Sequence, residues 1–496
     1  MGSPWPNPLE FWNKCVELEL MADIYFTNSL SGKKEKFEAI KPPCVGIYTC
    51  GPTVYDYPTI GNWRTYILSD LIVRILKYNG YQIDYVMNFT DVGHLTGDNS
   101  GDADTGEDRL EKAAKRERKT AWDVANYYIK DFKESFAKLN LTPPKIFCRA
   151  TEHIGEQIVL IKKLEEKGLT YKIDDGIYFD VSRYEKLGNQ YGELSTLDKI
   201  KAGARVETNP QKKDPRDFAL WKFSSKDKKR DMEWDSPWGI GFPGWHLECS
   251  AMSMKYLGER FDIHIGGEDL RSTHHPNEIA QSEGATEKKP FVKYWIHGAF
   301  LLVDGKRMGK SVGNAYNLHD IEEKKFNSLD LRYFYLTGHY RKQINFTREA
   351  LNSAKTALLK LRELLKGYKK EDRRTTLSQE KLDKTNQFRI QFDKAISDDL
   401  NMPQALSTIW EVVKSNIPDY DKYDLVESFD EVLGLNLNKI SDTEYSVSSE
   451  AKELVNQRVK LREMGKFDEA DEIRKEIEKL GYRIEDTDKG PKIKLV

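Results

Sequence analysis

The chain has 496 residues, of which 32% are charged, and a formal net charge of −2. At about 100–200 residues per domain, this length predicts about three domains, each able to bury a core without disulfides. No apolar run reaches the roughly 18 residues of a membrane-spanning helix, so no membrane partner is expected. The five cysteines are widely spaced and form no CxxC pair, which argues against a secreted disulfide framework and favours a reducing, cytoplasmic location.

The first part of the chain predicts a βαβ unit. Residues 1–20 read as irregular and are expected to be a leader or an expression remnant outside the fold. Strand-like runs cover 23–27, Val45–Thr49 and Tyr85–Phe89, and a helical pattern covers Trp63–Tyr78 between the last two. A strand, a helix and a strand joined by short turns are typical of a parallel sheet.

The middle of the chain mixes helical and strand-like patterns. An acidic, glycine-rich loop at 94–108 has the composition of a calcium loop, but its glycine and glutamate do not fall at EF-hand spacing, so a solvated insertion is expected. Further on, the sequence predicts helices at Arg109–Leu139 and Glu152–Lys167. A turn-rich region follows at Tyr171–Asp235, and strands are predicted at Asp262–Ile265 and Ala299–Val303.

From about Phe346 the pattern becomes helical. Amphipathic helices are predicted at Ala350–Tyr368, Glu380–Asp398 and Pro403–Ser415. A polar linker at 436–448 precedes a last piece, in which one long helix, Ser449–Leu480, is followed by two short strand-like runs around a glycine turn.

The segment Pro58-Thr59-Ile60-Gly61-Asn62 places a glycine turn at the start of a helix. Backbone N–H groups and the positive end of the helix dipole meet there, which suits a phosphate. Taken alone, the segment is more simply explained as an ordinary turn.

A second candidate is the loop from Lys306 to Asn314, which contains three glycines and three cations. A loop of this kind can close over a polyphosphate, with lysine acting as a point charge. Alone, it reads more simply as an exposed basic turn.

Cys50, Cys249, His274 and Glu278 offer thiolate, imidazole and carboxylate, all of which are zinc ligands. His274 and Glu278 are four residues apart, so one helical turn puts them on one face, with Pro276 tolerable only in the first turn. The alternative is two buried free thiols and a polar surface histidine, since the spacing matches no zinc finger.

Together these segments resemble one family. The motifs occur in the order Cys50–Tyr55, Ile60–Asn62, Asn88–Asp91, Pro243–Ser253, Phe261–His264, His274–Ser282 and the glycine-lysine loop. This series is similar to that of cysteinyl-tRNA synthetase, a class I synthetase, and the resemblance runs from about Ile24 to the C-terminus.

The resemblance implies an α/β fold class. A Rossmann-type catalytic domain with a parallel sheet is interrupted by an inserted domain, and a helical bundle and a small α+β C-terminal domain follow. The expected boundaries are 21–345 for the catalytic domain (109–235 inserted, 300–345 closing-loop region), 346–435 for a tRNA-binding bundle, 436–448 for the linker and 449–496 for the anticodon-recognition domain.

The resemblance also implies an activity: ATP-dependent ligation of L-cysteine to its tRNA through a cysteinyl-adenylate, by a monomer. One Zn²⁺ per chain would be held by Cys50, Cys249, His274 and Glu278. The cysteine pocket would be formed by Thr53, Thr90 and Trp245. ATP, with Mg²⁺, would contact Gly61, Gly266, Gly267, Asp269 and Lys310. The catalytic residues would be Lys310, Thr59 and Asn62. Thr59 and Asn62 belong to the first signature, Pro52–Asn62, and Lys310 belongs to the closing loop, Arg307–Ser311.

The sequence departs from the family pattern in both signatures. Threonine 59 stands where histidine is usual, and it can donate one hydrogen bond to a phosphate oxygen but cannot carry charge. Arg307 and Gly309 stand where lysine and serine are usual. An active enzyme is still expected, because Lys310 and the zinc ligands remain.

Two rival functions fit the sequence less well. A ligase that joins cysteine to an amino-sugar would resemble only the catalytic part, and the roughly 150 residues after Phe346 argue against it. A catalytically dead tRNA-binding paralogue would be expected to lose Lys310 or the zinc ligands.

Overall fold

The computed structural model describes residues 23–93, 95, 106–195, 209–225, 229–309, 312–368, 377–438, 449–480, 482–487 and 490–495. The chain divides into two compact units. The first comprises the described residues up to Asp320 together with His339–Ile344 and Ala395–Asn401, and the second comprises the rest. Among the described residues, no helix is both long and apolar enough to cross a membrane.

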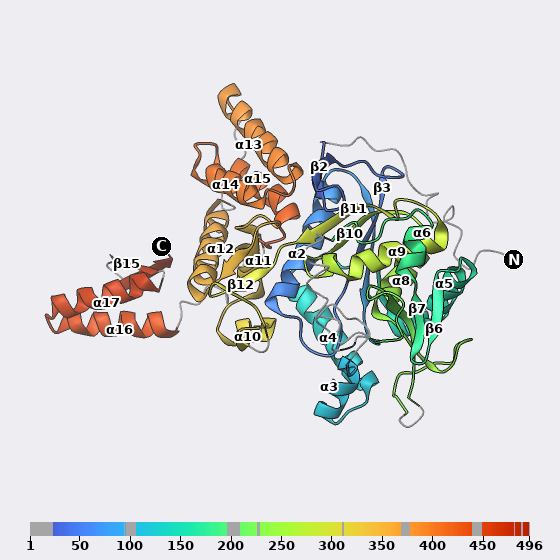
Figure 1. The fold of residues 1–496 in the computed structure, drawn as a ribbon. Helices are drawn as coiled ribbons and strands as arrows, with labels where there is room; N and C mark the ends of the chain where they lie inside the picture. The colour runs from blue at the N-terminus through green and yellow to red at the C-terminus, as the bar shows by residue number, and fades with distance from the viewer. Residues whose placement is uncertain are drawn as a thin grey trace. The chain divides into compact units, whose positions relative to one another are not determined.

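The first unit is built around a five-stranded parallel sheet in the order β11-β10-β3-β4-β5, at the centre of the unit in Figure 1. All six residues of β3 are buried, as expected for a strand covered on both faces. The strands are β3 (Cys44–Thr49), β4 (Gln82–Phe89), β5 (Ile146–Arg149), β10 (Phe261–Gly267) and β11 (Val292–Gly298). The α/β fold class with a parallel catalytic sheet is confirmed.

Three helices bring functional segments to this sheet. Helix α2 (Ile60–Tyr78) packs against β4, β10 and β11, and α8 (Trp245–Leu257) packs against β3, β4 and α9 (His274–Thr286). In Figure 1, α2 lies on one side of the sheet and α8 and α9 lie on the other. Because the strands are parallel, their carboxyl ends share one edge, where ligands of open α/β sheets bind.

The region predicted as one helix at Arg109–Leu139 forms two. Helix α3 (Arg109–Glu117) ends where Arg118 adopts a left-handed conformation with φ of 56°. Helix α4 (Ala121–Lys138) starts anew at Thr120, whose hydroxyl accepts from the backbone of Asp123 in a capping box. Local capping therefore outweighs the continuous helical pattern.

A separate antiparallel sheet in the order β6-β7-β8-β9 follows helix α5 (Ile154–Glu166). Its strands are β6 (Thr170–Ile173), β7 (Gly176–Phe179), β8 (Phe218–Phe223) and β9 (Gly241–Pro243), with α6 (Val181–Lys186) after β7. The range predicted for the insertion, 109–235, thus also contains β5 of the parallel sheet.

Short elements complete the first unit. They are β1 (Tyr25–Asn28), β2 (Lys33–Lys36), the 3-10 turns η2 (Ala150–His153) and η3 (Leu270–Ser272), β12 (Leu301–Val303), β13 (Lys306–Arg307) and the start of α10 (Leu318–Glu323). Strand β14 (Ile344–Phe346) stands at the unit boundary in the sequence.

Within the first unit, the segment Ala395–Asn401 is bonded to its surroundings through one buried carboxylate. Asp399 accepts hydrogen bonds from the backbone N–H and the hydroxyl of Thr27, at 2.8 and 2.7 Å. It also accepts from the Tyr340 hydroxyl at 2.6 Å and from Arg341 Nε at 2.8 Å. These four bonds satisfy a carboxylate that is only 3% exposed.

The second unit is mainly helical, and its predicted helices are confirmed. They are α12 (Arg348–Tyr368), α13 (Gln379–Ser397) and α14 (Met402–Lys414), and the sequence reading missed α11 (Ser328–Leu336) and α15 (Asp419–Leu433). Phe392 and Phe429 stack at 3.9 Å between centroids in its core.

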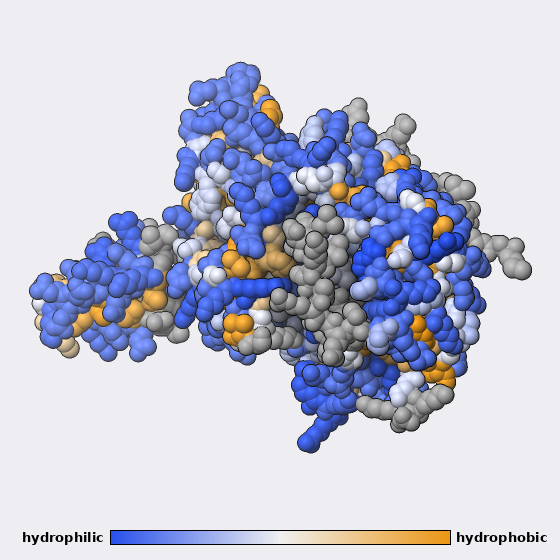
Figure 2. Space-filling view, viewed as in Figure 1, coloured by the Kyte–Doolittle hydropathy of each residue, from blue (hydrophilic) through white to orange (hydrophobic). Residues whose placement is uncertain are grey.

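The C-terminal piece has a small core of its own, formed by Val455, Ile477 and Ile484. The single helix predicted at Ser449–Leu480 is instead two helices, α16 (Ser449–Glu463) and α17 (Phe467–Lys479). The break is at Gly465, which has a φ of 73°, a conformation that residues other than glycine rarely adopt. Strands β15 (Tyr482–Thr487) and β16 (Gly490–Leu495) pair antiparallel. Figure 2 shows a mainly hydrophilic surface over α13 and over the pair α16 and α17.

Candidate active site

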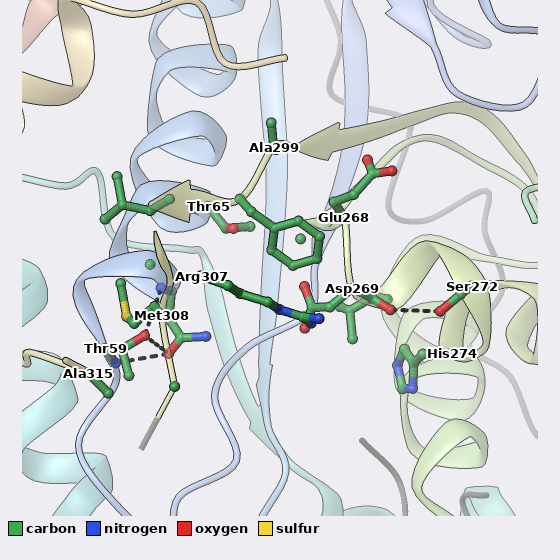
Figure 3. A pocket seen from close by; sticks show the side chains of 18 of the residues that line it. Thr59, Thr65, Glu268, Asp269, Ser272, His274, Ala299, Arg307, Met308 and Ala315 are labelled. Atoms are coloured by element: carbon green, nitrogen blue, oxygen red, sulfur yellow. Dashed lines mark hydrogen bonds between the residues drawn. The ribbon is translucent and has the colours of Figure 1, made fainter. Parts of the chain in front are cut away.

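A cavity of about 530 Å³ opens at the carboxyl ends of β10 and β11 and at the start of α2 (Figure 3). Polar side chains and glycines dominate its wall, as expected for a nucleotide site. It is lined by Tyr55, Thr59, Gly61, Asn62, Thr65, Arg109, Trp245, Gly267, Glu268, Asp269, Leu270, Ser272, Thr273, His274, Gly298, Ala299, Phe300, Leu301, Arg307, Met308, Gly309 and Ala315. The two signatures predicted from the sequence therefore meet in one cavity.

The start of α2 forms the wall at the first signature. Thr59 is the N-cap, and it forms a capping box with Asn62. The Asn62 amide oxygen accepts from the backbone N–H of Thr59 at 2.9 Å and from its hydroxyl at 2.8 Å. The N–H groups of Ile60 and Asn62 are bonded to the Tyr316 carbonyl and the Thr59 hydroxyl, at 2.8 and 3.3 Å, and the positive end of the helix dipole suits an anion at this point.

The predicted nucleoside contacts divide into two groups. Gly267 and Asp269 line the cavity. Gly266 lies in β10 next to them but faces His275: a Cβ there would stand 2.5 Å from its ring. Gly266 therefore makes room for a buried imidazole at the base of the site.

The closing loop follows the hairpin β12–β13. The Arg307 guanidinium lies 5.2 Å from the ring centroid of Phe300 and on the cavity side (Figure 3). The backbone N–H of Gly309 donates to the Asn314 side chain at 2.9 Å, which closes the loop. Lys310 and Ser311 lie outside the described residues.

The four predicted zinc ligands meet beside this cavity. Cys50 follows β3, Cys249 lies in α8, and His274 and Glu278 lie in the first turns of α9, so that Pro276 falls in the first turn, where it is tolerated. Their ligand atoms lie within 4.8 Å of one another, and all four residues are buried. The two sulfurs are 3.8 Å apart, and His274 Nε2 is 3.0 Å from Glu278 Oε1.

The acidic and imidazole groups of the cluster shift each other's pKa: against the effect of burial, Glu278 and Cys249 raise the pKa of His274 to about 10. Burial opposes ionisation of Glu278, but His264 and His274 lower its pKa to about 2. Burial also opposes the Cys249 thiolate, yet the Cys50 thiol and His274 lower its pKa to about 6. Buried anionic donors are costly without a compensating positive charge. The residues present fit a zinc ion, which prefers this mixture of sulfur, nitrogen and oxygen.

A second donor set shares two of these residues. Cys50, His264, His275 and Glu278 also have ligand atoms within 4.8 Å. The set with two sulfurs suits zinc better, since thiolate is a strong zinc ligand. His264 Nε2 forms a hydrogen bond with the other Glu278 oxygen at 2.9 Å. A neighbour bonded in this way orients a metal ligand.

His274 is held in the same way. Its Nδ1 lies 2.9 Å from Nδ1 of His246, so that Nε2 faces Glu278. One of the two nitrogens must donate in this pair, and the tautomer that protonates His274 Nδ1 leaves Nε2 free for a metal.

Of the three residues predicted for the cysteine pocket, Trp245 contacts this cluster, and Thr53 and Thr90 lie next to each other. Thr53 and Thr90 pair in a parallel β-bridge, and the Thr90 hydroxyl accepts from the Asn88 amide at 3.2 Å. Trp245, at the start of α8, lines the cavity, and its ring centroid is 4.3 Å from that of His274. Trp245 and His274, one of the predicted ligands, therefore line the cavity side by side.

The sequence reading missed the wall formed by Thr65, Glu268 and Gly298–Leu301. The signal was present, because the run Phe291–Gly298 is rich in apolar and aromatic residues, and it forms the unpredicted strand β11. Residues just after a parallel strand are expected at the ligand edge of the sheet.

Comparisons with known proteins agree with this geometry. The family model of the tRNA synthetases class I (C) catalytic domain matches residues 36–356. Cysteine--tRNA ligase 1 of Burkholderia lata is 44% identical over 92% of this chain and 94% of its own length. Cysteine--tRNA ligase of Treponema denticola is 41% identical over 92% of this chain and 97% of its own length.

Among solved structures, methionyl-tRNA synthetase of Mycobacterium tuberculosis in complex with methionyl-adenylate superposes with a TM-score of 0.53. It is 15% identical and covers 79% of this chain and 90% of its own. At this identity the likeness concerns the fold.

Proposed function

The chain belongs to the cysteine–tRNA ligases of the class I tRNA synthetases, and from this premise we propose that it selects L-cysteine through a zinc ion held by Cys50, Cys249, His274 and Glu278. As a member of this family it is an enzyme that ligates cysteine to tRNA. The observation that carries the zinc proposal is the convergence of four buried donors from three segments beside the cavity.

The proposed zinc accounts for selectivity. Cys50, Cys249, His274 and Glu278 would hold the ion, which would supply a Lewis acid that binds the substrate sulfur as a thiolate. Serine is nearly isosteric, but its hydroxyl keeps its proton and is a harder, weaker ligand for this site. A pocket that selected by size alone would favour cysteine over serine by only about 10–200-fold. Thr53, Thr90 and Trp245 are proposed to enclose the amino acid, with the indole excluding water.

ATP is proposed to occupy the cavity over the start of α2, near Gly61, Gly267 and Asp269. The cysteine carboxylate attacks the α-phosphorus, pyrophosphate leaves, and a cysteinyl-adenylate forms. Most of the protein's work is to position the reactants and stabilise charge on phosphate oxygens. We propose that Lys310 and Mg²⁺ stabilise the negative charge that develops on the pyrophosphate. Thr59 and Asn62 are proposed to contact the start of the phosphate chain.

The second half-reaction joins the cysteinyl group to tRNA, when a ribose hydroxyl at the 3′ end attacks the adenylate. We propose that the C-terminal piece recognises the anticodon. Arg458 is 1% exposed and donates to both Asp486 oxygens at 2.9 Å, so its role is structural. Lys460 and Lys466 are exposed and remain candidates. We further propose that the acting form is a cytoplasmic monomer.

The direct test of this function is ATP–pyrophosphate exchange with each of the twenty amino acids. Cysteine alone is expected to support rapid exchange, because only its side chain supplies a thiolate to the metal. Serine is the matched control. Exchange with another amino acid at the rate seen with cysteine would contradict the proposal.

A truncated chain ending after Asn438 separates the two half-reactions. This end point keeps Leu437, which is fully buried and bonded to Asp430, and removes the piece with its own core. Cysteine-dependent exchange is expected to stay within about twofold, whereas charging of tRNA falls by more than about tenfold, a loss of 1.4 kcal/mol in binding.

The control for this truncation is the salt dependence of tRNA binding. Affinity of the full chain should fall as salt rises, because phosphate contacts release counterions, and the slope should be smaller for the truncated chain. Equal charging by the two proteins would show that the C-terminal piece does not recognise tRNA.

A further inference from the structure

Two residues in the wall of the cavity, Ala299 and Phe300, lie between regular strands. Strand β11 ends at Gly298 and β12 begins at Leu301, so the two residues belong to neither strand. Both line the cavity, and Figure 3 shows Ala299 at its wall. The Ala299 backbone N–H donates to the Tyr340 carbonyl at 2.9 Å. The orientation of this short link is therefore set by contacts outside the strands, including those of its own carbonyl oxygens.

Those carbonyl oxygens are bound by a buried guanidinium from helix α2. Arg64 is 5% exposed, and its Nη1 donates to the carbonyls of Ala299 and Phe300, at 2.7 and 2.9 Å. Its Nη2 donates to the carbonyls of His339 and Lys342, at 3.1 and 2.5 Å. A carbonyl oxygen can only accept, so binding four of them takes a side chain with several donors in a fixed fork, which arginine has.

Arg64 acts on the cavity from outside it. It is not among the described residues that line the cavity, although its neighbour Thr65 is. The turn that it also binds, 339–342, holds the Ala299 N–H through the Tyr340 carbonyl. All of these segments belong to the first unit. One guanidinium thus fixes this part of the wall relative to α2, both directly and through the turn.

The same wall supports the closing loop. The Arg307 guanidinium lies 5.2 Å from the centroid of the Phe300 ring, on the cavity side (Figure 3). Strands β12 and β13, which lead into the loop, follow directly after Phe300. A shift of the main chain at Phe300 would therefore move a cation of the loop together with the wall.

We propose that Arg64 is a positioning residue for the ATP site: it holds the wall at Ala299 and Phe300, and through the Phe300 ring it holds the Arg307 cation, where the nucleotide needs them. The proposal rests on the ATP site proposed above and adds a residue that lies behind its wall. A displacement of about 1 Å at a reacting site can cost about 10²-fold in rate, so bonds that fix one wall are sufficient to affect the reaction.

The sharpest test is Arg64→Lys, measured in the full-length protein by ATP–pyrophosphate exchange. Lysine keeps the charge and three donors but lacks the planar fork, so it cannot bind all four carbonyls. We expect KM for ATP to rise about tenfold or more, as when a hydrogen bond to a charged group is lost. KM for cysteine and the zinc content should hardly change, because the donor cluster is untouched. A lysine variant with the parent's KM for ATP would overturn the proposal.

Arg64→Ala with guanidinium in solution is a second test. The alanine variant leaves a space lined by the carbonyls that the arginine binds. Millimolar guanidinium chloride should therefore lower KM for ATP toward the parent's value, whereas sodium chloride at the same concentration should not. No recovery, or equal recovery with the two salts, would contradict the assigned role. The lysine variant decides the question if the alanine variant does not fold.

The route through Phe300 is tested by a double-mutant cycle. Phe300→Leu removes the ring beneath Arg307 and keeps the main chain, and it should also raise KM for ATP. Because both changes disturb the same link, the variant that combines Arg64→Lys with Phe300→Leu should lose less than the sum of the two single losses. Fully additive losses would contradict a role of Arg64 through Phe300.

The matched control is Arg332→Lys. Arg332 is fully buried in α11, its Nε donates to the Leu433 carbonyl at 2.6 Å, and it is not among the described residues that line the cavity. This change should lower the melting temperature and leave KM for ATP unchanged. An equal rise of KM in the control would show that loss of any buried guanidinium explains the effect at Arg64. If the parent protein gave no cysteine-dependent exchange, the proposed function itself would fail, which is a separate outcome.

Discussion

Cys249→Ala is expected to remove most of the bound zinc and to lower cysteine-dependent pyrophosphate exchange by more than about 10²-fold. Loss of a group that only orients a ligand typically costs 10–100-fold in metal affinity or activity, and Cys249 is proposed as a ligand itself. Its sulfur lies 3.8 Å from that of Cys50 in the buried cluster. The measurements are elemental analysis of the purified protein and the exchange rate.

The matched control is Cys148→Ala. Cys148 is also a buried free thiol, but its sulfur contacts the backbone oxygen of Met87 at 3.6 Å and belongs to neither donor set. This variant should keep one zinc per chain. A Cys249→Ala protein with a full equivalent of zinc would contradict the assigned ligand set.

The second large effect is expected for Lys310→Ala, which should lower kcat for adenylate formation by about 10²–10³, the loss typical of one removed transition-state donor. Its neighbours Arg307 and Gly309 line the cavity in which ATP is proposed to bind. Binding of cysteine should hardly change, because the donor cluster is untouched.

Lys306→Ala is the control for charge in this loop. Lys306 is exposed in β13 and is not among the residues that line the cavity. It should retain the parent's kcat. If Lys310→Ala exchanged pyrophosphate as fast as the parent, the loop would be an ordinary surface turn.

Local patterns in the sequence were sufficient to predict most helices and strands of the sheet. They failed where a local conformation overrides a periodic pattern: Arg118, in a left-handed conformation, ends α3 within a continuous helical pattern. The reading also missed two elements whose signal was present. Strand β11 is rich in apolar and aromatic residues, and the buried residues of α15 recur at helical spacing.

The donor cluster shows why a site is harder to predict than a fold. Cys50 and Cys249 are 199 positions apart, so no spacing rule connects them, and only the resemblance to a family favoured a zinc site over two free thiols. The roles of His264 and His246 could not be foreseen, because they depend on which nitrogen faces which neighbour. The same is true of the Thr59 hydroxyl, whose hydrogen is given to Asn62.

The central claim, selection of cysteine by its thiolate, is tested most directly by X-ray absorption at the zinc edge. Without substrate, the proposed ligands give two sulfurs and two lighter atoms. Adding cysteine should raise the count to three sulfurs at about 2.3 Å, and adding serine should leave it at two. A sulfur count that stays at two with saturating cysteine would contradict the account.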